Sequence, residues 1–499
     1  MAERRVAVVD LGSNSFRIVV FTAGDGWWRR TDEIHEAVRI GEGMEKTGEL
    51  GAEPMERALS TIELFAHFHH AIGEPEIDAV ATSAIRAAQN RAAFLRKARR
   101  HLPVRVLSEE EEARYGYLAA VNSTSLADGL VLDLGGGSLQ LVRVKQREAR
   151  HLRSWRLGAV RMTERFLPDE GPAAKKQLKA LRAHVAVALE DAPWLGKAER
   201  IVGIGGTMRN LAVAAQIAGD VPTFGVQGFV LRRDALDDLV ASLAGMTTAE
   251  RAKVPGIKAA RGDLILAGAT TIQTVLREAG LDAIEVTEAG LREGVFFERH
   301  LGDAGLFPDV RGASVRNLAM QYSHDDMPHV EHVAELALGM FDDLVRAGLH
   351  PGKRVERELL WAAAMLHDIG VAVDYDDHHK HSRYLILSAG LPGYSQREIA
   401  LVAQIARYHR KGTPALDDME PCAEKGDAAL VARCAALLRL AEQLERSRDQ
   451  MVRSARVHVD DGTVELRLEG KGDVSLARWA AQRQQDVFER AFERALVVA

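Results

Sequence analysis

The sequence predicts an α/β protein with two related halves that flank a cleft, followed by a helical domain and a small α+β unit. Three observations support this prediction. From the N-terminus to His300, short β-type runs alternate with helical stretches. The pattern Asp-Leu-Gly-x-x-Ser occurs twice, starting at Asp10 and at Asp133, which indicates a duplicated α/β unit. From Ser314 to Arg453 the pattern is almost wholly helical and rich in histidine.

The first half opens with two strands that enclose a glycine-containing turn. A helix, a short buried strand and a basic helix follow this hairpin. In chain order these elements are expected at Arg4–Asp10, Phe16–Thr22, Glu53–Ile72, Ala79–Thr82 and Asn90–His101.

The second half repeats the strand–turn–strand opening and ends with two further strand–helix units. The expected strands are Gly129–Asp133, Leu139–Lys145, Ile201–Ile204 and Ile284–Val286, and the last two lead into helices through Ala215 and His300. Because two such halves leave a cleft between them, we expect the ligand site there.

Beyond the second half, a stretch rich in glycine, aspartate and proline, Gly302–Gly312, is typical of a linker. After the helical region, two strands are expected at Ala455–Asp460 and Thr463–Glu469, and a final helix at Leu476–Val497. We therefore expect four domains, with the ranges 1–127, 128–307, 308–453 and 454–499.

The composition excludes several classes of protein. The 499 residues carry a net charge of −6 and are 47% hydrophobic, which excludes a disordered chain and a globally basic nucleic-acid binder. The two cysteines, Cys422 and Cys434, cannot form a disulfide framework or a cysteine-rich zinc site. No apolar run is long enough to span a membrane. We therefore expect a cytoplasmic protein with no membrane or nucleic-acid partner.

The paired glycine turns favour an anion site. Glycine lets backbone amides approach an anion closely, and successive amides in a turn form an anion-binding nest. Asp10 and Asp133 end the two strands that precede these turns. Two carboxylates facing each other across a cleft suit Mg²⁺, which shares oxygen ligands with substrate phosphates.

Two further segments are candidates for the same cleft. Ser83 and Arg86 follow a buried strand and could clamp a phosphate, as could Arg17 after the first turn. The run Glu109–Glu112 complements the dipole of a helix that starts after Ser108. Because successive helical residues point to different faces, one glutamate of the run can face the cleft and polarise a water, but spacing alone does not identify it.

Six motifs together resemble the exopolyphosphatase/guanosine-pentaphosphatase (Ppx/GppA) family. They are Asp10–Arg17, Thr82–Arg86, Ser108–Leu118, Leu132–Leu141, Gly203–Ala212 and Glu288–Val295. The family is similar to the actin, sugar-kinase and heat-shock chaperone superfamily, so the resemblance implies duplicated actin-like (ribonuclease H-like) halves.

The resemblance also implies roles for individual residues. Asp10 and Asp133 would serve Mg²⁺, and Glu112 would be the general base. The residues that would hold phosphate are Ser13, Asn14, Arg17, Ser83, Arg86, Gly135, Gly136, Gly137, Ser138, Gly205, Gly206 and Thr207.

One residue departs from the family pattern. The second turn of the family carries a catalytic glutamate where this chain has Gln140. Glutamine can hydrogen-bond a water, but it cannot accept a proton or lend negative charge to a metal. Two outcomes are open: Glu112 suffices as the base, or the site binds phosphates without hydrolysing them.

The histidine-rich region resembles an HD-type phosphohydrolase domain, as appended in long Ppx/GppA proteins. Its candidate ligands for a second divalent metal are His332, His367, Asp368 and Glu442, with Glu442 at the place where HD domains have aspartate. The alternative is a degenerate domain whose histidines serve packing and binding of the anionic chain.

The expected function is Mg²⁺-dependent release of orthophosphate from the end of inorganic polyphosphate. Three alternatives remain: hydrolysis of guanosine pentaphosphate, a non-catalytic phosphate or alarmone sensor, and a nucleotide phosphohydrolase acting through the HD-type domain. The resemblance further implies a homodimer.

Overall fold

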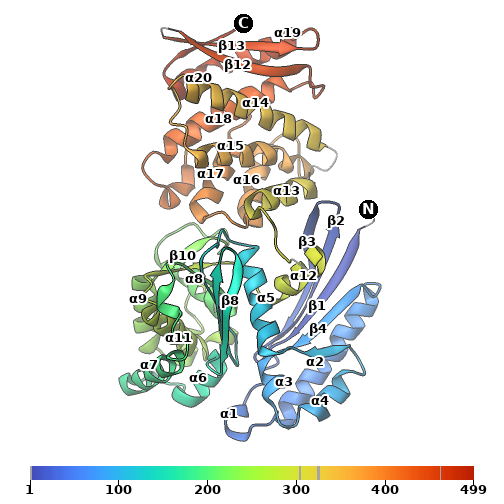
Figure 1. The fold of residues 1–499 in the computed structure, drawn as a ribbon, viewed down its shortest axis with the longest axis vertical. Helices are drawn as coiled ribbons and strands as arrows, with labels where there is room; N and C mark the ends of the chain where they lie inside the picture. The colour runs from blue at the N-terminus through green and yellow to red at the C-terminus, as the bar shows by residue number, and fades with distance from the viewer. Residues whose placement is uncertain (1–2, 303–304, 323–325, 461) are drawn as a thin grey trace. The chain divides into compact units, whose positions relative to one another are not determined.

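The computed structural model describes residues 3–302, 305–322, 326–460 and 462–499. The chain divides into two compact units, Met1–Val310 and Arg311–Ala499 (Figure 1). Part of the expected linker Gly302–Gly312, residues 303–304, lies outside the described residues.

The first sheet has the strand order β3-β2-β1-β4-β5. Strands β1, β2 and β3 pair antiparallel, whereas β4 and β5 continue parallel to β1. The strands are β1 (Arg4–Leu11), β2 (Phe16–Gly24), β3 (Trp27–Glu36), β4 (Glu76–Ala81) and β5 (Val104–Val106).

The second sheet repeats this arrangement in the order β8-β7-β6-β9-β11, with β10 added antiparallel at the edge. Its strands are β6 (Gly129–Leu134), β7 (Leu139–Lys145), β8 (Glu148–Trp155), β9 (Ile201–Ile204), β10 (Phe229–Arg232) and β11 (Ala283–Val286). The repeated topology confirms the predicted duplication, and β1 and β6 occupy equivalent central positions.

Helices cover the outer face of each sheet (Figure 1). The first sheet has α2 (Ala52–Ala71), α3 (Ser83–Ala87) and α4 (Arg91–Ala98); the second has α7 (Lys175–Leu189), α8 (Gly206–Ala218), α9 (Arg233–Ala244) and α11 (Ile265–Glu278). Shorter helices are α1 (Met44–Thr47), α6 (Ala159–Phe166), α10 (Thr248–Arg251), η1 (Leu195–Lys197) and η2 (Ala259–Arg261).

A third core lies between the two sheets and contains α5 (Glu109–Val121) and α12 (Leu291–Leu301) (Figure 1). The inner faces of both sheets contribute buried residues to it, including Val8 and Phe21 from the first sheet and Val131 from the second. The Phe21 and Phe296 rings stack at 4.4 Å between centroids. This shared core holds the central strands β1 and β6 in one unit.

The second unit is a group of packed helices followed by a three-stranded sheet. Its elements are α13 (Val310–Tyr322), α14 (Met327–Arg346), α15 (Arg354–Leu366), η5 (Ile369–Ala372), α16 (His378–Ala389), α17 (Gln396–Arg407), η6 (Asp417–Cys422), α18 (Asp427–Leu444), β12 (Val452–Asp460), β13 (Thr463–Gly470), α19 (Ser475–Gln482), α20 (Gln485–Phe492) and β14 (Ala495–Val498). The helical region followed by an α+β end matches the predicted fold class.

The end of the chain differs from the single helix expected at Leu476–Val497. The structure has two short helices, and β14 then pairs parallel with β13. Glu493 adopts a φ of +54°, a left-handed conformation that ends α20. Leu496 and Val498 are buried while Val497 is exposed, which is the alternation of a strand.

Strands β3 and β8 were also not expected. Both are edge strands with mostly exposed or half-buried residues, so they lack the apolar alternation that identifies a strand in a sequence.

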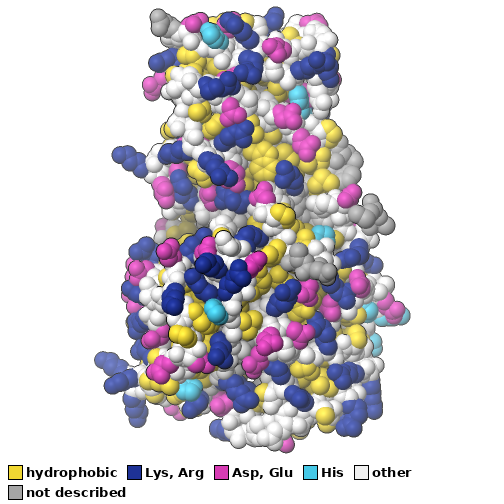
Figure 2. Space-filling model, in the orientation of Figure 1, with side chains coloured by type: hydrophobic (Ala, Val, Ile, Leu, Met, Phe, Trp, Pro, Cys, Tyr) yellow, Lys and Arg dark blue, Asp and Glu magenta, His cyan; other side chains and the backbone are white. Residues whose placement is uncertain are grey.

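None of the helices in the described ranges has the length and apolar character needed to cross a membrane. Figure 2 shows acidic and basic side chains interspersed over the visible face, in keeping with the small net charge.

The contact between α5 and α12 should be sensitive to a single methyl group. A Cβ added at Gly294 would clash with the backbone carbonyl of Tyr115. Because backbone cannot move aside cheaply, Gly294→Ala should lower the free energy of unfolding of the Met1–Val310 unit by about 1–3 kcal/mol. Gly339→Ala is the matched control, since a Cβ there meets nothing within 4 Å in helix α14. Thermal denaturation of the full chain measures both variants. A Gly294→Ala variant as stable as wild type would contradict the close packing of α5 against α12.

Candidate active site

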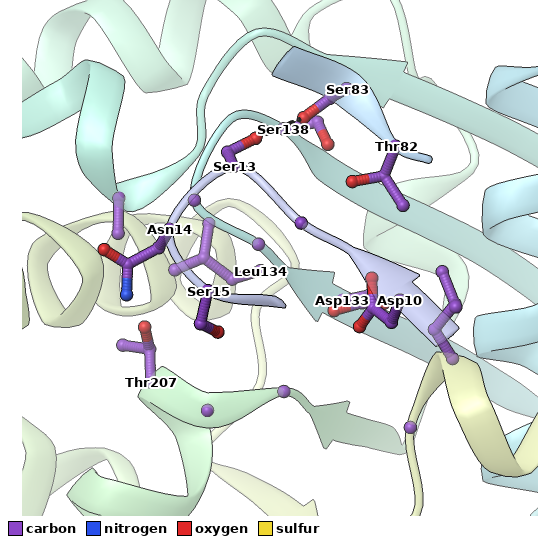
Figure 3. Close-up of a pocket in the computed structure, with 18 of the residues that line it drawn as sticks. Asp10, Ser13, Asn14, Ser15, Thr82, Ser83, Asp133, Leu134, Ser138 and Thr207 are labelled. Carbon is purple, nitrogen blue, oxygen red and sulfur yellow. Dashed lines mark hydrogen bonds between the residues drawn. The ribbon is translucent and has the colours of Figure 1, made fainter. Parts of the chain in front are cut away.

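A cavity of about 130 Å³ opens where the two duplicated openings face each other in the Met1–Val310 unit (Figure 3). It is lined by both glycine turns, the strand ends before them and the first turns of α5, α8 and α12. Most of the predicted site residues line it: Asp10, Ser13, Asn14, Arg17, Ser83, Glu112, Asp133, Gly135, Gly136, Ser138, Gly205, Gly206 and Thr207.

The two glycine turns have the same internal hydrogen bond. The amide of Gly12 donates to the Ser15 carbonyl at 3.2 Å, and the amide of Gly135 donates to the Ser138 carbonyl at 3.0 Å. The repeated sequence therefore folds into a repeated backbone shape.

The turns also meet in space. In Figure 3 the Ser13, Ser83 and Ser138 side chains gather at one side of the cavity, and the Ser13 and Ser83 hydroxyl oxygens are 3.0 Å apart. A Cβ at Gly137 would lie 2.7 Å from Ser13 Oγ and would clash with Ser83 Oγ. The absence of a side chain at Gly137 therefore leaves room for both hydroxyls where the two turns meet, although Gly137 itself does not line the cavity.

Asp10 and Asp133 lie at the ends of the equivalent strands β1 and β6, and Figure 3 shows their carboxylates side by side. Burial raises the pKa of both groups. For Asp133 the neighbouring Glu112 and Asp10 carboxylates add to this effect, so its pKa rises to about 7. For Asp10 the positive charges of the Arg292 and Arg17 guanidinium groups lower the pKa and so oppose the effect of burial.

The structure selects one glutamate from the run Glu109–Glu112. Glu111 closes a capping box with Ser108, while Glu109 and Glu110 are exposed. Only Glu112 of this run is buried, and its Oε2 accepts a hydrogen bond from Arg86 at 2.8 Å. Burial raises the Glu112 pKa, and the Arg86 charge opposes that effect. The face of α5 that carries Glu112 thus turns toward the cavity.

Arg86 was expected to clamp phosphate, but it is not among the residues that line the cavity. It also donates to the Leu107 carbonyl at 3.0 Å, so it is held behind Glu112. In this structure its contact is with the carboxylate of the expected base.

Four arginines line the cavity, of which the sequence analysis named only Arg17. Arg209 and Arg292 lie within motifs quoted above for the family resemblance, whereas Arg261 belongs to no motif. Burial and then the charges of Arg292 and Arg209 lower the pKa of Arg17 to about 10. Burial is the main cause, and the positive charge of Arg209 a smaller one, that lowers the pKa of Arg261 to about 10. The arginines thus form one mutually repelling cationic group, which a phosphate anion would stabilise.

Gln140 lies behind the second turn. It pairs with Asp133 across strands β6 and β7, is 2% exposed, and donates from Nε2 to Ser138 Oγ at 2.8 Å. It does not line the cavity. Because directly opposed side chains share one face of a sheet, a glutamate here would add a fourth carboxylate near Asp133.

The cavity residues fit a divalent cation and an anion together. Among the described residues, the Asn14 Oδ1 and Arg292 Nε atoms are buried without a hydrogen-bond partner. The carboxylates supply the oxygen ligands that Mg²⁺ prefers. Among the described residues they do not form one compact three-ligand group.

In the Arg311–Ala499 unit, the structure brings together three of the four expected ligands of a second metal. Nε2 of His367 lies 3.1 Å from Glu442 Oε2 and 3.6 Å from Asp368 Oδ1. Burial alone would lower the pKa of His367, but Asp368 and Glu442 outweigh it and raise the pKa to about 9.

His332 lies outside this group. Its Nε2 donates to the Val452 carbonyl at 2.8 Å and lies 3.6 Å from Glu445. His329, one turn earlier on α14, has its Nε2 3.2 Å from Glu442 instead. The sequence analysis expected His332 in the group, whereas the structure places His329 beside Glu442; the two positions lie on the same helical face.

The raised pKa of Asp133 predicts a pH-dependent stability. The folded carboxyl has a pKa of about 7 against an ordinary value of 3.8, so the folded state holds its proton more tightly than the unfolded state. The stabilisation present below the ordinary pKa is therefore lost as the pH rises through 7. The Asp133→Asn variant, stripped of metal, should melt at a higher temperature than wild type at pH 8.

That difference in melting temperature should shrink as the pH is lowered toward 4. The exposed Asp238→Asn variant is the control and should match wild type at every pH. Equal melting temperatures of Asp133→Asn and wild type at pH 8 would contradict the burial of an ionised Asp133.

Comparisons with known proteins agree with this geometry. A family model described as the Ppx/GppA phosphatase family matches residues 19–302, and one described as Ppx/GppA phosphatase, domain III, matches residues 310–479. The Aquifex aeolicus member of the Ppx/GppA family is similar, with 29% identity, a TM-score of 0.51, and coverage of 60% of this chain and 98% of that chain.

An exopolyphosphatase-like protein is 28% identical, with a TM-score of 0.55 and coverage of 60% of this chain and 99% of its own. An exopolyphosphatase from Cytophaga hutchinsonii is 23% identical, with a TM-score of 0.56 and coverage of 61% and 100%, and shows the likeness in fold. The two matched family models, together with the duplicated turns and the carboxylates between them, show that the chain belongs to the Ppx/GppA phosphatase family.

Proposed function

We propose that this phosphoanhydride hydrolase acts on inorganic polyphosphate and releases orthophosphate from its end with the help of Mg²⁺. The observation that carries the proposal is the make-up of one cavity. Three carboxylates line it together with two glycine turns and four arginines; Glu112 is buried, whereas Asp10 and Asp133 are half-buried. Such a lining is suited to a strongly charged phosphate chain and to the cation that accompanies it.

Asp10 and Asp133 would hold Mg²⁺. When bound, the ion would offset negative charge on the phosphate oxygens. It would also relieve the mutual repulsion that raises the pKa of Asp133.

The protein groups have separate tasks. The amides and hydroxyls of the two turns would hold the terminal phosphoryl group, with Ser13 and Ser138 on opposite turns. The arginines would bind the oxygens of this group and of the next phosphate. Because these donors are already in place, little reorganisation accompanies the reaction.

Glu112 would align a water opposite the bridging oxygen and accept its proton. The water oxygen forms a bond to the terminal phosphorus, and the bond from phosphorus to the bridging oxygen breaks. That oxygen leaves with the electron pair, on a chain shortened by one phosphate. Burial gives Glu112 a raised pKa, which favours proton uptake near neutral pH. Arg86 would act as a positioning residue by holding the carboxylate through its 2.8 Å hydrogen bond.

The lining favours polyphosphate over guanosine pentaphosphate. Among the described residues that line the cavity, none is aromatic, so no ring is available there to stack on a guanine base. Recognition of a repeating phosphate chain requires only positively charged groups, and the arginines supply them. Mg²⁺ dependence, the homodimer and the four-domain division stay predictions.

The assigned base can be tested with a conservative variant. Glu112→Gln keeps the size of the side chain but removes its proton-accepting carboxylate, so kcat for orthophosphate release should fall about 10²–10⁴-fold. Glu110→Gln is the matched control, because Glu110 lies in the same run and is exposed. Its kcat should equal that of wild type. Wild-type turnover by Glu112→Gln would overturn the assignment.

Substrate choice can be tested by direct comparison. Orthophosphate release should show a kcat/KM for long-chain polyphosphate at least ten times that for guanosine pentaphosphate, with Mg²⁺ present in both assays. Polyphosphate should also inhibit hydrolysis of the nucleotide, because both would occupy one cavity. A higher kcat/KM for guanosine pentaphosphate would show that the nucleotide, and not polyphosphate, is the preferred substrate. Binding of both compounds without hydrolysis of either would support the sensor alternative.

A further inference from the structure

Helix α6 lies directly behind the second glycine turn, and most of it has no role in the hydrolysis proposed above. Its first three residues donate hydrogen bonds to three consecutive carbonyls of that turn, and only the third of these bonds comes from a side chain. The bonds run from Ala159 N to Gly135 O at 3.0 Å, from Val160 N to Gly136 O at 2.8 Å and from Arg161 Nε to Gly137 O at 3.0 Å.

These bonds determine where the amides of the turn point. In a planar trans peptide, the carbonyl of one residue and the amide of the next point in opposite directions. Because the three carbonyls face α6, the amides of Gly136, Gly137 and Ser138 face away from it. Within the described part of the chain, these amides donate to no backbone carbonyl. Gly136 and Ser138 line the cavity, so the contact with α6 directs the amides to an anion there.

The first turn has the same arrangement. The carbonyls of Ser13 and Asn14 accept hydrogen bonds from the amides of Gly41 at 3.0 Å and Arg39 at 2.8 Å. The amides of Asn14 and Ser15 therefore face away from the segment that follows β3. In each half, a segment that follows the third strand thus lies behind the turn and sets the direction of its amides. We call these two segments, residues 38–45 and α6, the backing segments.

The backing segments also contact each other across the two halves of the Met1–Val310 unit. Nη1 of Arg161 donates to Glu45 Oε2 at 2.6 Å, and the amide of Gly43 donates to Glu164 Oε1 at 2.9 Å. Arg161 is buried, with 9% of its surface exposed. Its guanidinium therefore bonds the turn of its own half through Nε and a carboxylate of the other half through Nη1. The planar guanidinium suits this task because it holds its donors in fixed relative directions.

We propose that Arg161 is a positioning residue for phosphate binding. It fixes the Gly137–Ser138 peptide so that the amide points at the terminal phosphoryl group, and its bond to Glu45 sets the second turn relative to the first. The inference rests on the proposed function, which supplies the phosphoryl group. Donors from both turns must match one anion in the transition state, so their relative placement affects the rate. A displacement of about 1 Å can lower a rate about 100-fold.

The kinetic test separates the two contacts of Arg161. Arg161→Met keeps a long apolar side chain but removes both hydrogen bonds, so kcat for orthophosphate release should fall about 10–100-fold. Arg161→Lys keeps a charged donor without the planar fork and should recover part of this loss. Glu45→Ala changes an exposed residue and spares the bond to Gly137, so its effect should be smaller than that of Arg161→Met.

The matched control is Arg165→Met, which alters an exposed arginine of the same helix and should keep the kcat of wild type. Circular dichroism checks that each variant is folded. Wild-type kcat in a folded Arg161→Met variant would overturn the proposal.

A second readout needs no substrate. The sequence contains two Gly-Ser pairs, Gly12–Ser13 and Gly137–Ser138, and one lies in each turn. Labelling the glycine carbonyls with ¹³C and the serine amides with ¹⁵N therefore gives two cross-peaks in an HNCO spectrum of the full chain. A Ser13→Thr variant removes one cross-peak and so assigns both.

Arg161→Met should shift the Gly137–Ser138 cross-peak and leave the Gly12–Ser13 cross-peak in place, while Arg165→Met should move neither. Glu45→Ala should shift the Gly137–Ser138 cross-peak in the same direction by a smaller amount. An unmoved Gly137–Ser138 cross-peak in Arg161→Met would overturn the proposal even where polyphosphate is hydrolysed. Wild-type protein that hydrolyses no polyphosphate would contradict the proposed function and leave these spectra interpretable, so the two failures are distinct.

Discussion

The Met1–Val310 unit is organised around three carboxylates that line one cavity. Asp10, Glu112 and Asp133 each have a pKa raised by burial, and for Glu112 and Asp133 the neighbouring carboxylates raise it further. A cluster of this kind opposes folding unless positive charge is supplied. Arg86 supplies it to Glu112, and Arg292, 3.5 Å from Asp10, supplies it from α12. The remaining deficit of positive charge is what a divalent cation would fill.

The fold meets this requirement by duplication and by a shared core. Equivalent strands, β1 and β6, bring equivalent aspartates to one place, and equivalent turns follow each of them. Helices α5 and α12 pack between the two sheets and bring Glu112 and Arg292 to the strand ends. Groups that line the cavity from the two halves are thereby held by one hydrophobic core. Close packing of Gly294 against the Tyr115 backbone leaves little freedom for α5 and α12 to shift.

Sequence reasoning succeeded for features that depend on neighbouring residues and fell short for those that depend on distant ones. The two turns, their aspartates and the α/β repeat were predicted because each is encoded within a short segment. The edge strands β3 and β8 were not, since their exposed residues lack apolar alternation. Arg261 is 244 positions from Arg17 in the chain (261 minus 17), and no local pattern indicates that both line one cavity.

By itself, the sequence determined the fold class, the duplication, and the strand ends and turns that carry the oxygen ligands and amides. The tertiary structure alone decided which glutamate faces the cavity, that Arg86 contacts Glu112, and that His329 and not His332 lies beside Glu442. The physical reason is the same in each case. A residue's type follows from the sequence, whereas the direction of its side chain follows from the rotation of its helix and the surfaces packed against it.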